Sequence, residues 1–201
     1  MLSKKADWQL IVLVCSLIII MIMGVRQSLG LFLEPISQFM KDGKEFFSFA
    51  IGFQAIIWGV VTFGLGILID KFGPQKVLAF GIVCFASGIF LMSNPNNQLT
   101  LFSATSLMGF GLGGAGMATM VSIAGKVAPT EKRSFAMGLI AAAASFGQFA
   151  VVLPTMWMNK IFGWETSLIV LSIITISLLL LLPILNNTNE QNNKNDIFKD
   201  G

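Results

Sequence analysis

The chain has 201 residues, of which 55% are hydrophobic and 11% are charged, and it contains no histidine. This composition is too apolar for an ordinary soluble domain, and the apolar residues fall in long blocks, so the sequence predicts an all-α integral membrane protein. The net charge of +3 and the pI near 9.0 come from the loops, which indicates contact with anionic lipid rather than with nucleic acid.

Six segments approach the roughly 20 apolar residues that a helix needs to cross a bilayer. The third is short and needs residues from its flanks. Arg26 is the only charged residue within the six. The first segment is too long for a signal peptide and has no clear small-residue cleavage site. In chain order the predicted segments are residues 8–32, 46–69, 77–92, 99–124, 135–157 and 166–185.

The composition divides the chain into two parts. Residues 1–185 form the predicted six-helix transmembrane bundle, and residues 186–201 are polar, which predicts a disordered cytoplasmic tail or linker. Cys15 and Cys84 both fall inside predicted segments. They are too few for a disulfide framework or a metal site, so we expect them to be packing residues and expect no metal or cofactor.

The distribution of lysine and arginine predicts the orientation. If the N-terminus is cytoplasmic, the inner loops carry Lys4, Lys5, Lys71, Lys76, Lys126, Lys132 and Arg133. The outer loops then carry Lys41, Lys44 and Lys160. This excess on one side predicts a multi-pass protein of the plasma (inner) membrane with both termini in the cytoplasm.

A charged turn separates the second and third segments. Gly66, Asp70, Lys71, Gly73 and Lys76 follow the pattern Gly-x-x-x-Asp-Lys-x-Gly-x-x-Lys. This pattern resembles the signature loop between helices two and three of the major facilitator superfamily, from which Gln75 departs because that position is usually basic. The alternative is that the charged residues only cap a short interfacial turn.

The resemblance covers the whole apolar length of the chain, but only the N-terminal half of a facilitator. It implies a facilitator-type half-bundle of two inverted three-helix repeats and secondary transport by alternating access. Residues 132–138 and 24–32 are similar to the monocarboxylate and oxalate/formate branch. Thr105 stands where proton antiporters of the family carry an arginine, which disfavours drug/proton antiport. No Asp, Glu or His lies inside any predicted segment, so any proton coupling would need a carboxylate in a partner half.

Arg26 is the leading candidate for substrate contact. A charged side chain at the bilayer centre costs about 2.5–3.5 kcal/mol and usually faces the bundle interior or water. A guanidinium binds a carboxylate through two parallel hydrogen bonds. With Gln27, Gln54 and Gln148 it could line a polar cavity that selects small organic anions. Alternatively, Arg26 reaches the outer headgroups and the glutamines only join helices.

The cytoplasmic loops contain candidate gating residues. Asp70 could pair with Arg133 and close the inner side in one conformation, with Gly66, Lys71, Gly73 and Lys76 shaping the turn. The alternative is that Arg133 only contributes to the positive-inside bias.

Several other patterns favour structural roles. Gly111, Gly113 and Gly116 match a dinucleotide-binding spacing but lie inside an apolar segment with no preceding strand, so helix packing explains them better. Pro154 could kink the fifth helix. Three tryptophans near segment ends fit an aromatic belt: Trp8, Trp157 and Trp164.

Neither a nucleophile with a base nor paired carboxylates occur, so we do not expect an enzyme. The sequence favours a secondary transporter, or half of one, for a small organic anion such as a mono- or dicarboxylate, working with a second six-helix half or as a homodimer. The competing interpretation is a truncated, non-transporting scaffold or regulatory fragment.

Overall fold

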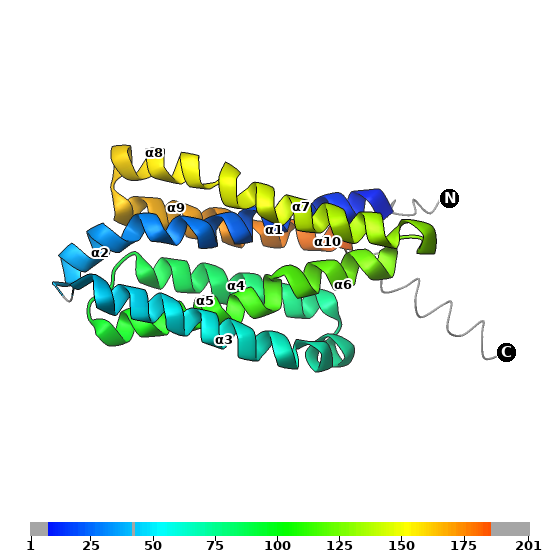
Figure 1. Cartoon of the computed structure of the whole chain (residues 1–201), viewed down its shortest axis with the longest axis horizontal. Helices are drawn as coiled ribbons and strands as arrows, with labels where there is room; N and C mark the ends of the chain where they lie inside the picture. The colour runs from blue at the N-terminus through cyan, green and yellow to red at the C-terminus, as the bar shows by residue number, and fades with distance from the viewer. Residues whose placement is uncertain (1–7, 42, 186–201) are drawn as a thin grey trace.

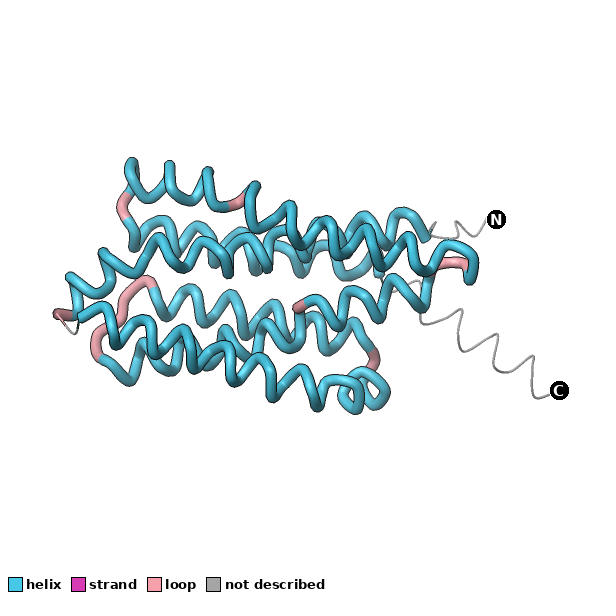
Figure 2. Tube along the Cα trace, viewed as in Figure 1, coloured by secondary structure: helices cyan, strands magenta, loops and turns pink. Residues whose placement is uncertain are grey.

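Ten α-helices and three short 3-10 helices make up the described part of the chain, residues 8–41 and 43–185 of a computed structural model, in which no strand occurs (Figures 1 and 2). Six stretches of helix are long and apolar enough to span a membrane. The expected all-α fold with six spans is therefore confirmed. The predicted tail, residues 186–201, lies outside the described residues.

The first span is longer than the sequence predicted. Helix α1 (Trp8–Ser28) continues through the 3-10 helix η1 (Leu29–Phe32) into α2 (Leu33–Met40), so the span runs to Met40 rather than to residue 32. Pro35 lies in the first turn of α2, where a missing backbone N–H costs nothing. The helix ends at Lys41, whose φ of 59° is left-handed and whose N–H donates to the Ser37 carbonyl.

Helices α3 (Gly43–Phe72) and α4 (Pro74–Met92) form the second and third spans and are joined by a single residue, Gly73. Its φ of 83° and ψ of 150° lie in a region that is essentially restricted to glycine. Pro74 begins α4 at the position where a proline is best tolerated. The short third segment thus gains residues from its N-terminal flank, whereas at its other end it stops at Met92, so the expected extension at both ends is confirmed at one end only.

The last three spans are interrupted helices. Extended backbone at Gly116 separates α5 (Gln98–Ala115) from α6 (Met117–Val127), and Val151 separates α7 (Arg133–Ala150) from α8 (Val152–Phe162). Because Pro154 has no N–H to donate to the Ala150 carbonyl, the second break occurs where a kink was expected. The 3-10 helix η2 (Thr130–Lys132) precedes α7, and the sixth span comprises α9 (Trp164–Ser177), η3 (Leu178–Leu181) and α10 (Leu182–Leu185).

Small residues bring the helices together. Helix α4 packs on α5 and α9, α1 packs on α7, and α3 packs on α5. A Cβ atom at Gly111 would lie 2.5 Å from the Phe85 backbone nitrogen, and one at Gly147 would lie 2.3 Å from the Ile20 carbonyl oxygen. The glycines of α5 are therefore packing residues, as expected. Cys15 and Cys84 are buried and unpaired, which agrees with the packing role that was predicted for them.

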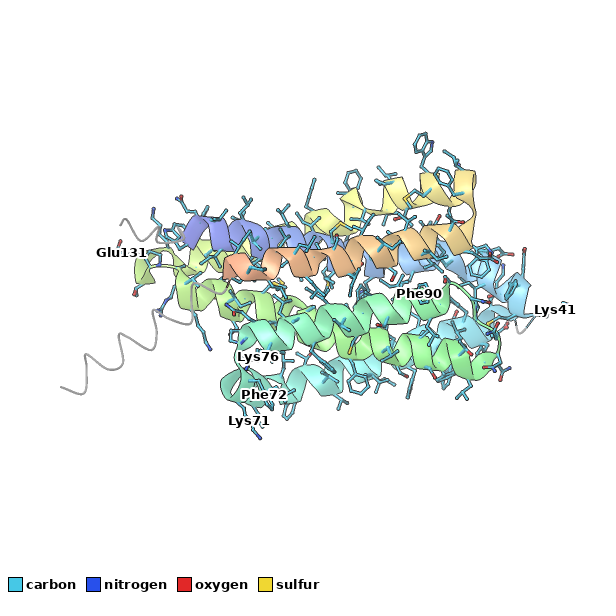
Figure 3. All side chains as sticks on the ribbon, turned by 180° about the vertical axis from the view of Figure 1, so that it is seen from behind. Lys41, Lys71, Phe72, Lys76, Phe90 and Glu131 are labelled. Atoms are coloured by element: carbon cyan, nitrogen blue, oxygen red, sulfur yellow. The ribbon has the colours of Figure 1, made fainter. Side chains whose placement is uncertain are left out.

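The charged residues gather at the two ends of the bundle. Figure 3 places Lys71, Lys76 and Glu131 at one end and Lys41 at the other. Between them, Arg26 is the one charged side chain of the described residues, and the apolar side chains that face outward include Phe63, Val60 and Phe149. This distribution is what a membrane-spanning bundle needs, with the exception of Arg26.

Candidate substrate site

Arg26 lies in the last turn of α1, and its guanidinium points toward α3. Its Cζ lies 4.8 Å from the centre of the Trp58 ring, which is within the range of a cation–π interaction. The side chain is half-buried, and its Nε is fully buried without a hydrogen-bond partner. The guanidinium is therefore held in place by an aromatic face while it retains unused hydrogen-bond donors.

No described carboxylate pairs with Arg26. Those carboxylates all lie in the first turns of helical segments: Glu34, Glu45, Glu131 and Glu165. In the described part of the chain the ion pair that forms is between Glu34 and Lys44, at the end of the bundle where α2 meets α3. The positive charge of Arg26 is thus available to an anion from outside these residues.

Gln54 lies one helical turn before Trp58 on the same face of α3. It is only 1% exposed, and its Nε2 has no hydrogen-bond partner. The α3 backbone is close to α5 here, since a Cβ at Gly109 would lie 2.9 Å from the Gln54 carbonyl oxygen. Gln54 therefore occupies the contact between α3 and α5 and keeps one donor unused, which is unusual for a buried amide.

The other two glutamines lie differently. Gln27 follows Arg26 on α1 and is exposed, and Gln148 on α7 is exposed beside Gly147, which contacts α1. Neither forms a hydrogen bond with the described residues. The structure therefore brings together Arg26 and the face of α3 that carries Gln54 and Trp58, and it leaves Gln27 and Gln148 on open surfaces.

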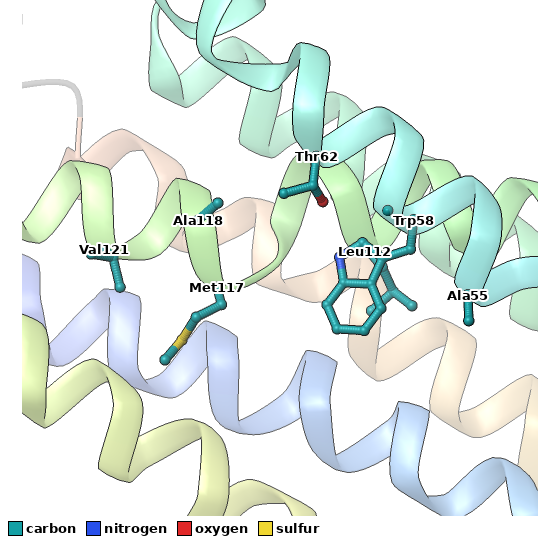
Figure 4. A pocket seen from close by; sticks show the side chains of 8 residues that line it. Ala55, Trp58, Thr62, Leu112, Met117, Ala118 and Val121 are labelled. Carbon is teal, nitrogen blue, oxygen red and sulfur yellow. The ribbon is translucent and has the colours of Figure 1, made fainter.

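Trp58 is the site residue that sequence reasoning missed. Three tryptophans near segment ends were assigned to the membrane interfaces, and Trp58 received no role. Its position in the middle of the second segment, four residues after Gln54, was the available signal. Trp58 also lines a cavity of about 590 Å³ between α3 and the junction of α5 and α6 (Figure 4).

Comparison with known proteins places this arrangement in a family. The model of the family described as Major Facilitator Superfamily matches residues 10–200. The chain belongs to the Major Facilitator Superfamily. The expected membership of this family is thereby confirmed, and the family consists of transporters rather than enzymes. The branch within the family is not assigned by this match.

Individual relatives of this facilitator are distant. An uncharacterized MFS-type transporter of Bacillus subtilis, YcxA, is 28% identical over 80% of this chain and 39% of its own length. An uncharacterized transporter of Buchnera aphidicola is 23% identical over 92% of this chain and 48% of its own. The agnestins efflux protein AgnL12 of Paecilomyces divaricatus is 26% identical over 62% of this chain and 27% of its own length. The chain thus spans less than half the length of these relatives.

The facilitator's charged turn is described in part. Gly73 has the positive φ noted above, and Lys71 lies over the Phe72 ring at 5.4 Å. Lys76 and Arg133, the first residue of α7, are exposed. The side chain of Asp70 and the surroundings of Gly66 are not among the described parts of the structure. The pairing of Asp70 with Arg133 therefore stays a prediction. In the described part of the chain, no three metal-ligating side chains lie together.

Proposed function

We propose that this chain is one six-helix half of a secondary transporter that moves a small organic anion, a mono- or dicarboxylate, across the plasma (inner) membrane by alternating access. The observation that carries the proposal is Arg26: a cation in a membrane-spanning helix, seated on Trp58 and unpaired with any described carboxylate. A charged side chain inside the membrane destabilises the fold unless an opposite charge compensates it. Such a residue without a partner is therefore better explained by ligand binding than by a structural role.

The geometry supports an organic anion rather than a cation. Arg26 offers a planar fork of donors that matches a carboxylate, and its Nε is buried without a partner. The Gln54 amide, one turn from Trp58 on α3, adds a second unused buried donor. A bound carboxylate would pair with the Arg26 guanidinium, whereas the Gln54 amide lies in the contact between α3 and α5 and would reach a ligand only if that contact opened.

We further propose that the transporting unit contains a second six-helix bundle, either another half or a second copy. The chain spans 39% and 48% of the length of its bacterial relatives. Helix α3, which carries Trp58, also presents an open apolar surface: Phe63 is 96% exposed, and Ile67, one turn later, is 75% exposed. An apolar helix face that nothing in the described part of the chain covers is suited to a partner helix.

The test combines oligomeric mass with transport. We would reconstitute the full chain into nanodiscs to determine its mass, and into proteoliposomes to measure the flux of labelled carboxylates. Flux should be followed in both directions, because one relative is named for efflux. We expect saturable flux that Arg26→Gln abolishes and Arg26→Lys strongly impairs. Lys160→Gln, which removes an exposed charge from α8, is the matched control and should leave transport unchanged.

The outcomes separate the two interpretations of the chain. A dimer with Arg26-dependent flux supports a transporter built from two copies. A monomer that binds carboxylates through Arg26 without transporting them supports a half that needs a different partner. A monomer that neither binds nor transports favours the scaffold or regulatory fragment, and an unchanged affinity in Arg26→Lys contradicts the carboxylate clamp.

A further inference from the structure

The cavity beside Trp58 is almost entirely apolar. Its volume is about 590 Å³, within the range of about 300–1,000 Å³ that small-molecule sites occupy. Figure 4 shows that α3 contributes Trp58 and Thr62, whereas Leu112, Met117 and Val121 come from the two sides of the break in the fourth span. The Thr62 hydroxyl and the Trp58 indole N–H are its polar side-chain groups, and no charged residue lines it.

The break at Gly116 gives the cavity its shape. The extended backbone there ends α5 and starts α6, so that Leu112 and Met117 line the same space. A Cβ atom at Gly116 would lie 2.1 Å from the Leu112 carbonyl oxygen and 3.5 Å from Trp58 Nε1. A glycine at this position therefore leaves room for the Leu112 carbonyl oxygen at the break, while an added Cβ would be in ordinary contact with the indole ring.

Trp58 connects the cavity to Arg26. The Arg26 guanidinium lies over the ring, with Cζ 4.8 Å from its centre, and the same side chain forms part of the cavity wall. A ligand whose carboxylate binds Arg26 would consequently place its remaining atoms along the indole ring and toward Leu112 and Met117. Trp58 thus contacts both the charged part of the site, Arg26, and the apolar part, the cavity.

We propose that this apolar cavity is a specificity subsite, and that the substrate is a monocarboxylate with an uncharged aliphatic or aromatic body. The proposal rests on the proposed function, because it assigns the carboxylate to Arg26. A dicarboxylate would have to bury its second charge among Leu112, Met117 and Val121, where no described cation compensates it. A very small anion would leave the cavity unfilled.

Gly59 provides a substitution that fills the cavity with little risk to the fold. It lines the cavity, and its added Cβ would meet nothing within 4 Å. Leucine is also a better helix former than glycine, so Gly59→Leu should be tolerated within α3. Gly52, two turns earlier on α3, also has open space but does not line the cavity, which makes Gly52→Leu the matched control.

The experiment measures the affinity of the full chain in nanodiscs for straight-chain carboxylates, by competition with labelled hexanoate and with empty nanodiscs subtracted. Propanoate, butanoate, pentanoate and hexanoate form the length series, and adipate is the dicarboxylate of the same length as hexanoate. We expect each added methylene to tighten binding by up to about fourfold, and adipate to bind more weakly than hexanoate. Gly59→Leu should remove the dependence on length while preserving propanoate binding, and Gly52→Leu should preserve both.

The result separates this inference from the function on which it rests. If Arg26→Gln abolishes binding but affinity does not depend on chain length, or adipate binds as well as hexanoate, the apolar subsite is wrong and the anion site stands. The same holds if Gly59→Leu leaves the length dependence intact. If no carboxylate binds, or Arg26→Gln binds as well as the unaltered chain, the subsite fails together with the proposed function. Trp58→Phe, which keeps an aromatic wall, should reduce the length dependence less than Trp58→Ala does.

Discussion

Gly73 and Gly163 adopt the same backbone conformation and make the same kind of connection at opposite ends of the bundle (Figure 1). Their φ and ψ angles are 83° and 150° at Gly73 and 81° and 167° at Gly163. Each follows a phenylalanine that ends one helix, and each is the single residue before the next helix, α4 or α9. Equivalent turns at the second and fifth spans indicate that the two halves of the bundle are built alike.

The helix contacts agree with this relationship. The first span packs on the fifth through α1 and α7, and the second packs on the fourth through α3 and α5. If the first span is matched with the fourth and the second with the fifth, the contact between spans one and five corresponds to the contact between spans four and two. This is the pairing that two inverted three-helix repeats require, and it gives the expected repeat organisation a structural basis.

The backbone at Gly73 leads to a stability prediction. Gly73→Ala forces a side chain into a region that is essentially restricted to glycine, so we expect a loss of about 1–3 kcal/mol in the free energy of unfolding. Gly64→Ala on α3 is the control, since its Cβ would meet nothing within 4 Å and alanine favours a helix. Thermal unfolding in nanodiscs compares them, and equal midpoints for both variants would contradict a special role for Gly73.

The six spans were predictable because the bilayer imposes one simple requirement, a length of apolar residues. Where the first span ends was not, because α2 continues as a helix past polar residues such as Glu34. The interruption near Pro154 was expected from the missing N–H of proline, whereas the break at Gly116 was not, since a cluster of glycines in a span indicates packing without showing which one departs from the helix.

The site was only partly predictable. Arg26 was found because a single charge among apolar segments is conspicuous. Trp58 was missed, and the placing of Gln27 and Gln148 at the cavity stays a prediction, for a common reason. In helices that are apolar all round, periodicity does not distinguish the face toward a cavity from the face toward another helix or lipid. That assignment needs the packing of α3 on α5 and of α1 on α7.

The contact between α1 and α7 should tolerate no side chain at Gly147. A Cβ atom there would lie 2.3 Å from the Ile20 carbonyl oxygen, and backbone cannot rotate away as a side chain can. We expect Gly147→Ala to lower the free energy of unfolding by about 1–3 kcal/mol. Gly138→Ala on the same helix meets nothing within 4 Å and should be neutral or slightly stabilising. Denaturant titration in detergent distinguishes them, and the reverse order would mean that the helices do not meet at Gly147.

The predicted gate can be tested by reversing its charges. We expect Asp70→Arg alone to abolish carboxylate flux, since it would place two cations at the proposed closing contact, and Arg133→Asp added to it to restore a measurable part of the flux. Arg133 is exposed at the start of α7, so its replacement should not disturb the bundle. Flux in proteoliposomes is the measurement. No recovery in the double variant would show that Asp70 and Arg133 do not act as a simple pair.

The expected orientation of the bundle, with both termini in the cytoplasm, can be tested by labelling. Figure 3 places Lys71 and Lys76 at one end, together with Glu131, and the positive-inside rule assigns that end to the cytoplasm. Cys15 and Cys84 are buried and should not react, so single cysteines can be added to the native chain. We expect an impermeant thiol reagent applied to intact cells to label Asn96→Cys and Lys160→Cys, and to reach Lys71→Cys and Lys126→Cys only after permeabilisation. All four positions are exposed, which makes each pair a control for the other. The opposite labelling pattern would show that the bundle has the reverse orientation, with the charged turn after α3 on the outer side of the membrane.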